Sequence, residues 1–246
     1  MLTSGTSLTM YAGLLGQGIV VTLELGVLAI VFGTLLGGAM GTLRVSSLAW
    51  LHRPIDAYVQ VVRSIPALVF LFVVYYGLPI VLGVGSLSPL LSAALAMSLH
   101  NAAYMCQIVR GGLEAVPRGQ WEAARALSLG YPAAMRKVIL PQALRIILPP
   151  LTLQCMGTFK ETSIASVIGL VDVTNTALVI RGNTGSDWDV LGVLALIYFA
   201  ICGTVSVIGH AAERRLDRGY HALDAAYGAT RPAPPRLPEL GEVAIG

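Results

Sequence analysis

One polar face stands out within a long apolar stretch of this chain. His100, Tyr104, Gln107 and Gly111 lie at positions i, i+4, i+7 and i+11, so a helix would place them on a single side. Polar side chains at membrane depth face a partner helix or a wet path and find hydrogen bonds there. This spacing predicts contact with a substrate path. Helix-to-helix hydrogen bonding without a ligand is an equally good interpretation.

A second polar group, Lys160, Glu161, Thr162 and Ser163, lies within another apolar block. Adjacent helical residues point about 100° apart, so Lys160 and Glu161 do not neutralise each other across one face. Each needs a different partner: a neighbouring helix, a second subunit, or water in a path. We predict path contact for this group, with purely structural pairing as the alternative.

Known enzyme and metal motifs are absent from the sequence. It contains no G-x-x-x-x-G-K-[ST] phosphate loop, no HExxH and no GxSxG, so the chain is not expected to be an enzyme or to bind a nucleotide itself. Cys106, Cys155 and Cys202 lie in apolar blocks without CxxC spacing, which predicts small buried hydrophobic side chains and no metal site.

The composition is that of a membrane protein. Hydrophobic residues make up 55% and charged residues only 12% of the 246 residues, whereas soluble domains carry roughly 25% charged residues. Apolar blocks of about 20 residues match the thickness of the bilayer core, roughly 30 Å. The fold expected is an all-α polytopic membrane protein with about five spans, near residues 20–43, 57–83, 87–109, 146–171 and 189–210.

The connections between these spans alternate in charge. Arg44 and Arg53 flank the first connection, residues 77–88 carry no charge, and the third connection, residues 110–145, is strongly basic. Because basic loops stay on the cytoplasmic side, the N-terminus is expected outside and the C-terminus inside. Residues 1–216 would form the transmembrane domain. Residues 217–246, Pro-rich from Ala229 on, would form a largely disordered cytoplasmic tail.

Glycines recur along the first span. Gly33, Gly37 and Gly41 are spaced four residues apart, which places them on one helix face. Small residues in this pattern let two membrane helices approach closely, so we predict a helix-packing face.

The basic third connection is patterned rather than loose. Gly119 is a candidate N-cap, with Glu122 placed to reach back to the first-turn amides, which predicts a helix over residues 120–129. Gly130 would end it in a left-handed conformation. A second helix would run over residues 133–140 and stop before Pro141, which suits the first turn of the next helix.

These residues resemble the EAA signature of ABC importer permeases. The resemblance rests on Glu122-Ala123-Ala124, on Gly130 and on Ile139-Leu140-Pro141. The wider strings PRGQWEAAR, VILPQA and KETS are similar to those of the subgroup that imports polar amino acids, although the family usually shows KDTS and an acidic residue where Gln107 stands. Residues 63–66 resemble its RGTP element, and Arg63 there suits an interfacial anchor at least as well as a gate.

The resemblance implies that the helix over residues 120–129 is a coupling helix seated in a groove of a separate ATPase. The residues implied in coupling are Gly119, Gln120, Trp121, Glu122, Ala123, Ala124, Arg125, Gly130 and Pro141. Trp121, Ala124, Arg125 and Ser128 share one face and would supply the anchors. The plainer interpretation, that Glu122 caps and Gly130 ends the helix, is compatible with this role.

The implied assembly is an importer in the bacterial inner membrane. ATP and Mg would bind the partner ATPases, and this chain would hold no cofactor. A second permease chain, identical or related, would complete the path, and an extracytoplasmic binding protein would deliver the amino acid. Lipid surrounds the spans, and no nucleic-acid contact is expected. The alternatives are an ion-gradient-driven transporter and a non-transporting scaffold.

Overall fold

The computed structural model describes residues 5–46 and 48–228, and every regular element in these ranges is helical. This confirms the all-α class. The elements are, in order, α1 (Gly5–Val45), α2 (Ala49–Ser64), α3 (Ala67–Phe72), a π turn (Val73–Gly77), α4 (Leu78–Leu82), α5 (Pro89–Glu114), α6 (Arg118–Ala126), α7 (Tyr131–Ala134), a second π turn (Met135–Ile139), α8 (Leu140–Glu161), a 3-10 helix (Thr162–Ile168), α9 (Val173–Thr184) and α10 (Asp187–Gly228).

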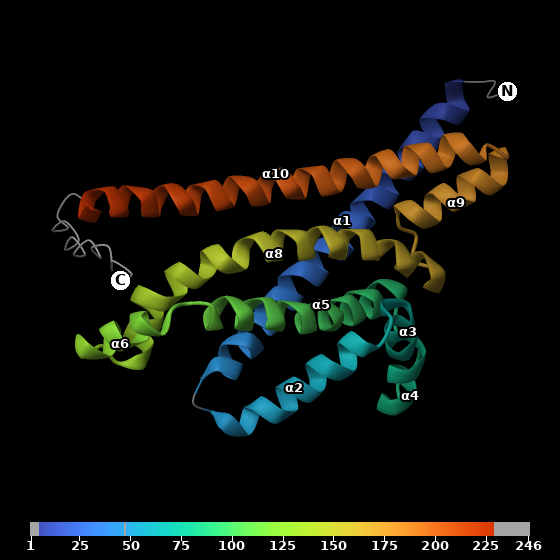
Figure 1. Cartoon of the computed structure of the whole chain (residues 1–246). Coiled ribbons are helices and arrows are strands. Elements are labelled where there is room, and N and C mark those ends of the chain that lie inside the picture. The colour runs from blue at the N-terminus through green and yellow to red at the C-terminus, as the bar shows by residue number, and fades with distance from the viewer. Residues whose placement is uncertain (1–4, 47, 229–246) are drawn as a thin grey trace, which may run out of the picture.

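Helix α5 lies at the centre of the bundle. It packs on α1 more extensively than any other pair of elements packs, and it also contacts α8 and α2. Figure 1 shows α10, α8, α5 and α2 as successive layers, with α1 crossing behind them. The α1–α2 connection, α6 and the C-terminal end of α10 lie at one end of the molecule, while α3, α4 and α9 lie at the other (Figure 1).

Three helical stretches in the described residues are long and apolar enough to cross a bilayer, or four if the bent α2–α3 pair is one span. The three are residues 10–45, 131–168 and 187–216. α5 is not among these stretches, although its 26 residues reach about 39 Å, which is long enough to cross a bilayer. A multi-pass membrane protein is therefore established, and the count of five stays a prediction.

The second predicted span is broken rather than straight. The helices over residues 49–64 and 67–82 meet at 108°. Ile65, which precedes Pro66, adopts an extended conformation with φ −98° and ψ 130°. The ring of a proline disfavours the α conformation of the residue before it, so the helix stops at Ser64 and restarts in a new direction.

The glycine stripe of α1 packs against α5, as predicted. A Cβ at Gly37 would lie 2.4 Å from the backbone oxygen of Ala102, and one at Gly41 would lie 2.7 Å from that of Cys106. A Cβ at Gly33 would meet the Asn101 side chain at 2.6 Å. The two backbones therefore approach as closely as only glycine allows. The three cysteines are buried, as expected, and are free thiols.

Two helix ends differ from the sequence-based expectation. Helix α8 does not start afresh at Pro141, because Leu140 is helical and the preceding π turn continues from α7. A π turn widens the backbone spiral and so relieves the clash between the proline ring and the preceding turn. Helix α10 continues to Gly228, so residues 217–228 are helical and not part of a disordered tail. The Pro-rich residues 229–246 lie outside the described residues.

Candidate functional site

The helix of the long basic loop is α6, which begins at Arg118 and ends at Ala126. Pro117, with φ −54° and ψ 136°, is its N-cap, and no side chain caps its first turn. The proposed roles of Gly119 as N-cap and of Glu122 as a capping partner are therefore wrong. Both residues lie inside the helix, because the fixed φ of Pro117 lets the helix begin directly after it.

The left-handed residue after α6 is Ser128 and not Gly130. Ser128 has φ 54°, and its N–H donates to the Arg125 carbonyl at 2.8 Å, while the Leu129 N–H donates to the Ala124 carbonyl at 3.0 Å. These two bonds satisfy carbonyl groups at the end of the helix. Gly130 has φ −63° and ψ 157° and is the N-cap of α7, so its predicted left-handed role is wrong.

The inner face of α6 packs on this chain itself. The Trp121 ring stacks on Tyr131 with centroids 5.8 Å apart and an interplanar angle of 21°, and the Ala124 side chain is 2% exposed. Trp121 also contacts a core made by the ends of α5 and α8: Leu113, Val116, Ile139, Ala143 and Ile147. The expectation that Ala124 anchors a partner is corrected, because this chain covers Ala124 itself. Trp121 is only half-buried, and Arg125 and Ser128 on the same face are exposed, so their contact with a partner stays a prediction.

The outer face of α6 has no such cover. Glu122 and Ala123 are exposed, and the Leu127 side chain just beyond the helix is 74% exposed. Gln120 lies at the edge between the two faces, where its Oε1 accepts a hydrogen bond from Gln142 Nε2 at 3.1 Å. This bond joins α6 to the first turn of α8, which contains Pro141.

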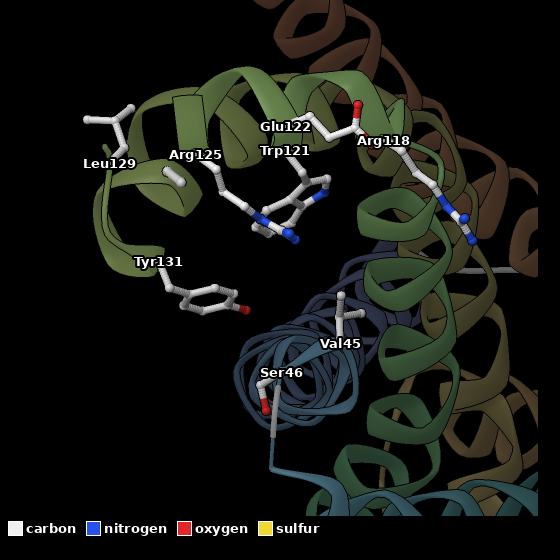
Figure 2. A pocket seen from close by; sticks show the side chains of 9 residues that line it. Val45, Ser46, Arg118, Trp121, Glu122, Arg125, Leu129 and Tyr131 are labelled. Carbon is white, nitrogen blue, oxygen red and sulfur yellow. The ribbon is translucent and has the colours of Figure 1, made fainter. Parts of the chain in front are cut away.

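A hollow of about 540 Å³ separates α6 and α7 from the C-terminal end of α1. In Figure 2, Trp121, Arg125 and Tyr131 point toward this hollow, while Glu122 and Leu129 point away from it. Val45 and Ser46 form its opposite wall (Figure 2). The coupling residues of the sequence therefore divide between an inner aromatic and cationic side and an outer, open side.

The predicted polar face on α5 divides between two cavities. His100 is 5% exposed, and its Nδ1 lies 3.6 Å from Oε2 of Glu161 in a small cavity of about 10 Å³. Tyr104 and Gln107 instead line a larger cavity of about 400 Å³ beside α2. Gly111 is exposed, and a Cβ there would meet nothing within 4 Å. These residues share one helix face, but not one site.

Residues 160–163 lie where α8 passes into the 3-10 helix. Lys160 is exposed and Glu161 faces His100, so the two do not pair with each other, as predicted. Thr162 is fully buried, and its hydroxyl donates to the Phe159 carbonyl at 2.7 Å. The Ser163 hydroxyl donates to the Lys160 carbonyl at 2.8 Å. The Thr162 side chain thus serves the helix junction. Path contact stays a prediction for all four residues.

Comparison with known families decides the class of this protein. The sequence profile of the binding-protein-dependent transport system inner membrane component family matches residues 29–231. The chain belongs to this family.

Individual relatives of this permease are amino-acid transport proteins. It is 36% identical over 199 residues to the probable amino-acid ABC transporter permease protein YckA of Bacillus subtilis (strain 168), covering 81% of this chain and 87% of the relative. It is 36% identical over 205 residues to the glutamate/aspartate import permease protein GltK of Escherichia coli O6:H1, covering 81% and 92%.

Solved structures share the fold. An amino acid ABC transporter crystallised with histidines matches with a TM-score of 0.77 and 34% identity, over 87% of this permease and all 100% of that chain. The inward-facing MetNI methionine ABC transporter matches with a TM-score of 0.72 and 22% identity, over 82% and 96%. The resemblance to ABC importer permeases is confirmed, and neither an ion-gradient-driven transporter nor a scaffold agrees with this family.

One polar centre of the permease was missed from sequence. Asn101 is 2% exposed, and its Nδ2 donates to the Ala29 carbonyl of α1 at 3.2 Å. Its Oδ1 accepts from Thr158 Oγ1 at 3.1 Å and from Gln154 Nε2 at 3.2 Å, both on α8. Asn101 thus joins three helices at the centre of the bundle. The sequence signal was the polar side chain of Asn101 within an apolar block. It was missed because Asn101 follows His100 directly and so does not lie on the polar face of His100, Tyr104 and Gln107.

Proposed function

We propose that this permease moves a polar amino acid inward across a bacterial inner membrane, driven by ATP hydrolysis on a separate subunit. Its relatives named as amino-acid permeases support the substrate class. A second permease chain, identical or related, completes the path, and an extracytoplasmic binding protein delivers the amino acid. ATP and Mg bind the ATPases, and this chain holds neither.

The position of α6 is the observation that carries this proposal. α6 lies at the same end of the molecule as the α1–α2 connection and the C-terminal end of α10 (Figure 1). Arg44, Arg53, Arg214 and Arg215 belong to that end. Basic residues mark the cytoplasmic side, so α6 faces the cytoplasm, the N-terminus lies outside and the C-terminus inside.

The outer face of α6 is the contact for the ATPase. Glu122, Ala123 and Leu127 are uncovered there, and the small Ala123 allows close approach. Movement of the ATPases shifts α6, and the bond between Gln120 and Gln142 transmits the shift to α8. Glu161 and the exposed Lys160 at the far end of α8 then change their surroundings in the path.

Co-purification with a candidate ABC ATPase subunit from the same organism tests the proposal. Ala123→Arg should abolish co-purification and uptake of labelled amino acids into liposomes, because a long charged side chain would occupy the contact. Arg53→Gln, exposed on α2 away from α6, is the matched control. Intact ATPase binding and uptake by Ala123→Arg would contradict the coupling role, and absence of amino-acid uptake by the natural complex would contradict the function.

A further inference from the structure

Arg63 carries a guanidinium group whose neighbour is an aromatic ring rather than a carboxylate. It lies at the C-terminal end of α2, next to the break in the second span. Its Cζ lies 5.0 Å from the centroid of the Tyr104 ring on α5. Within the described part of the chain Arg63 forms no ion pair. Its side chain is exposed in the single chain. A charged side chain within a membrane-spanning segment marks a ligand or ion path by default.

The cavity beside Arg63 is polar and has the size of a small-molecule site. It has a volume of about 400 Å³, within the range of about 300–1,000 Å³ usual for ligand pockets. Its polar lining consists of Asp56, Gln60, Arg63, Ser64, Tyr104 and Gln107. These side chains come from two helices, α2 and α5, that meet along the cavity.

The unbalanced charge in this cavity is positive. Asp56 is the acidic residue of the lining, and both of its carboxylate oxygens accept from Nε of Arg44, at 2.8 and 3.0 Å. Its negative charge is therefore already matched from outside the cavity. Among the described residues, the contact of the Arg63 guanidinium is with the face of Tyr104, which leaves its N–H donors available to a ligand.

A carboxylate is the ligand group that best fits this arrangement. The planar fork of a guanidinium binds a carboxylate through two parallel hydrogen bonds. The amides of Gln60 and Gln107 and the hydroxyls of Ser64 and Tyr104 add neutral donors and acceptors around it. A free amino acid carries such a carboxylate together with an ammonium group. The N–H groups of that ammonium can donate hydrogen bonds to the amide and hydroxyl oxygens of the lining.

We propose that this cavity is a transit site for the amino acid, and that Arg63 binds its α-carboxylate. The proposal rests on the proposed function for its substrate class. It assigns to Arg63 a contact common to all amino acids, so the cavity recognises the backbone of the substrate and not its side chain. Asp56 is held by Arg44 so that it does not compete for Arg63.

Binding to the purified permease–ATPase complex, without the binding protein, tests this inference. The complex in lipid nanodiscs is heated with each of the protein amino acids at millimolar concentration and with the corresponding amino-acid amides. We expect amino acids, but not their amides, to raise the unfolding temperature. Arg63→Gln should weaken this binding about 10- to 100-fold, the loss expected for a charge-assisted hydrogen bond.

Two further variants separate binding from folding. Arg63→Lys keeps the charge without the planar fork and should retain part of the discrimination between acid and amide. Arg53→Gln removes a charge from the same helix outside the cavity and should bind as the natural protein does. A general loss of structure in Arg63→Gln would instead lower its unfolding temperature in the absence of any ligand, while Arg63→Lys would still report on the charge.

Equal stabilisation by acids and amides, unchanged binding by Arg63→Gln, or no stabilisation of the natural complex would each overturn the inference. Uptake into liposomes with the binding protein is measured separately. Uptake by the natural complex without stabilisation in nanodiscs would overturn the cavity assignment and leave the proposed function standing.

Discussion

Oε2 of Glu161 lies 3.6 Å from Nδ1 of His100, at the point where α8 passes into a 3-10 helix. This contact joins the end of α8 to the central helix α5. The His100 ring also neighbours the rings of Phe70 and Tyr104, at 6.1 and 5.1 Å between centroids. Tyr104 in turn neighbours Arg63, so a continuous chain of contacts links the Glu161 carboxylate to the cavity beside α2.

Substitution of this pair should be non-additive. His100→Leu removes the polar partner of Glu161 and should lower the free energy of unfolding by about 1–3 kcal/mol. Combined with Glu161→Gln, the total loss should be at least about 0.5 kcal/mol smaller than the sum of the single losses. Thermal unfolding of the natural protein, both single variants and the double variant measures this. Strictly additive losses would show that the two side chains do not interact.

Asn101 should be the polar residue whose loss costs most within the bundle. Asn101→Leu removes hydrogen bonds to Ala29, Thr158 and Gln154. At about 0.6 kcal/mol for each bond in a membrane protein, the loss should be near 2 kcal/mol. Gln154→Leu removes only one of these bonds and serves as the comparison in an unfolding titration. Similar losses for the two variants would contradict a central role for Asn101.

Adjacent glycines on α1 should respond oppositely to alanine. Gly37→Ala would place a Cβ 2.4 Å from the Ala102 carbonyl oxygen, forcing α1 and α5 apart. We expect a loss of about 1–3 kcal/mol from this overpacking. Gly38→Ala meets nothing within 4 Å and should be neutral or slightly stabilising, because alanine favours helix. Equal stability of the two variants in thermal unfolding would contradict the close α1–α5 contact.

The end of α6 gives another matched pair. Ser128→Gly should stabilise the loop by about 1 kcal/mol, because φ 54° is costly for a residue with a side chain. Gly130→Ala should leave folding unchanged within about 0.5 kcal/mol, since φ is −63° and a Cβ would meet nothing within 4 Å. If folding of Gly130→Ala is unchanged but uptake falls, Gly130 acts in partner contact. Destabilisation by Gly130→Ala would contradict its described conformation.

The sequence by itself determined the class of the protein and the place of its loop helix. Apolar blocks of bilayer length are a property of composition, so the helical membrane fold and the glycine face of α1 followed directly. The spaced residues around Glu122 indicated the permease family, which residues 29–231 confirm. The effects of proline on the backbone were only partly predictable. Pro66 acts locally on the conformation of Ile65, whereas a π turn before Pro141 lets the helix continue where a break was expected.

Only the tertiary structure decided what each helix face meets. Helical spacing places Trp121, Ala124 and Arg125 on one face. Only the fold shows that Ala124 is buried and that Trp121 stacks on Tyr131 of α7, while Arg125 stays exposed. The same spacing places His100 and Gln107 on one side of α5. They nevertheless line two different cavities, because α2 bends away from α3 and α8 packs beside His100. A repeat of 3.6 residues fixes which side chains share a side, while their neighbours depend on contacts between residues distant in the chain.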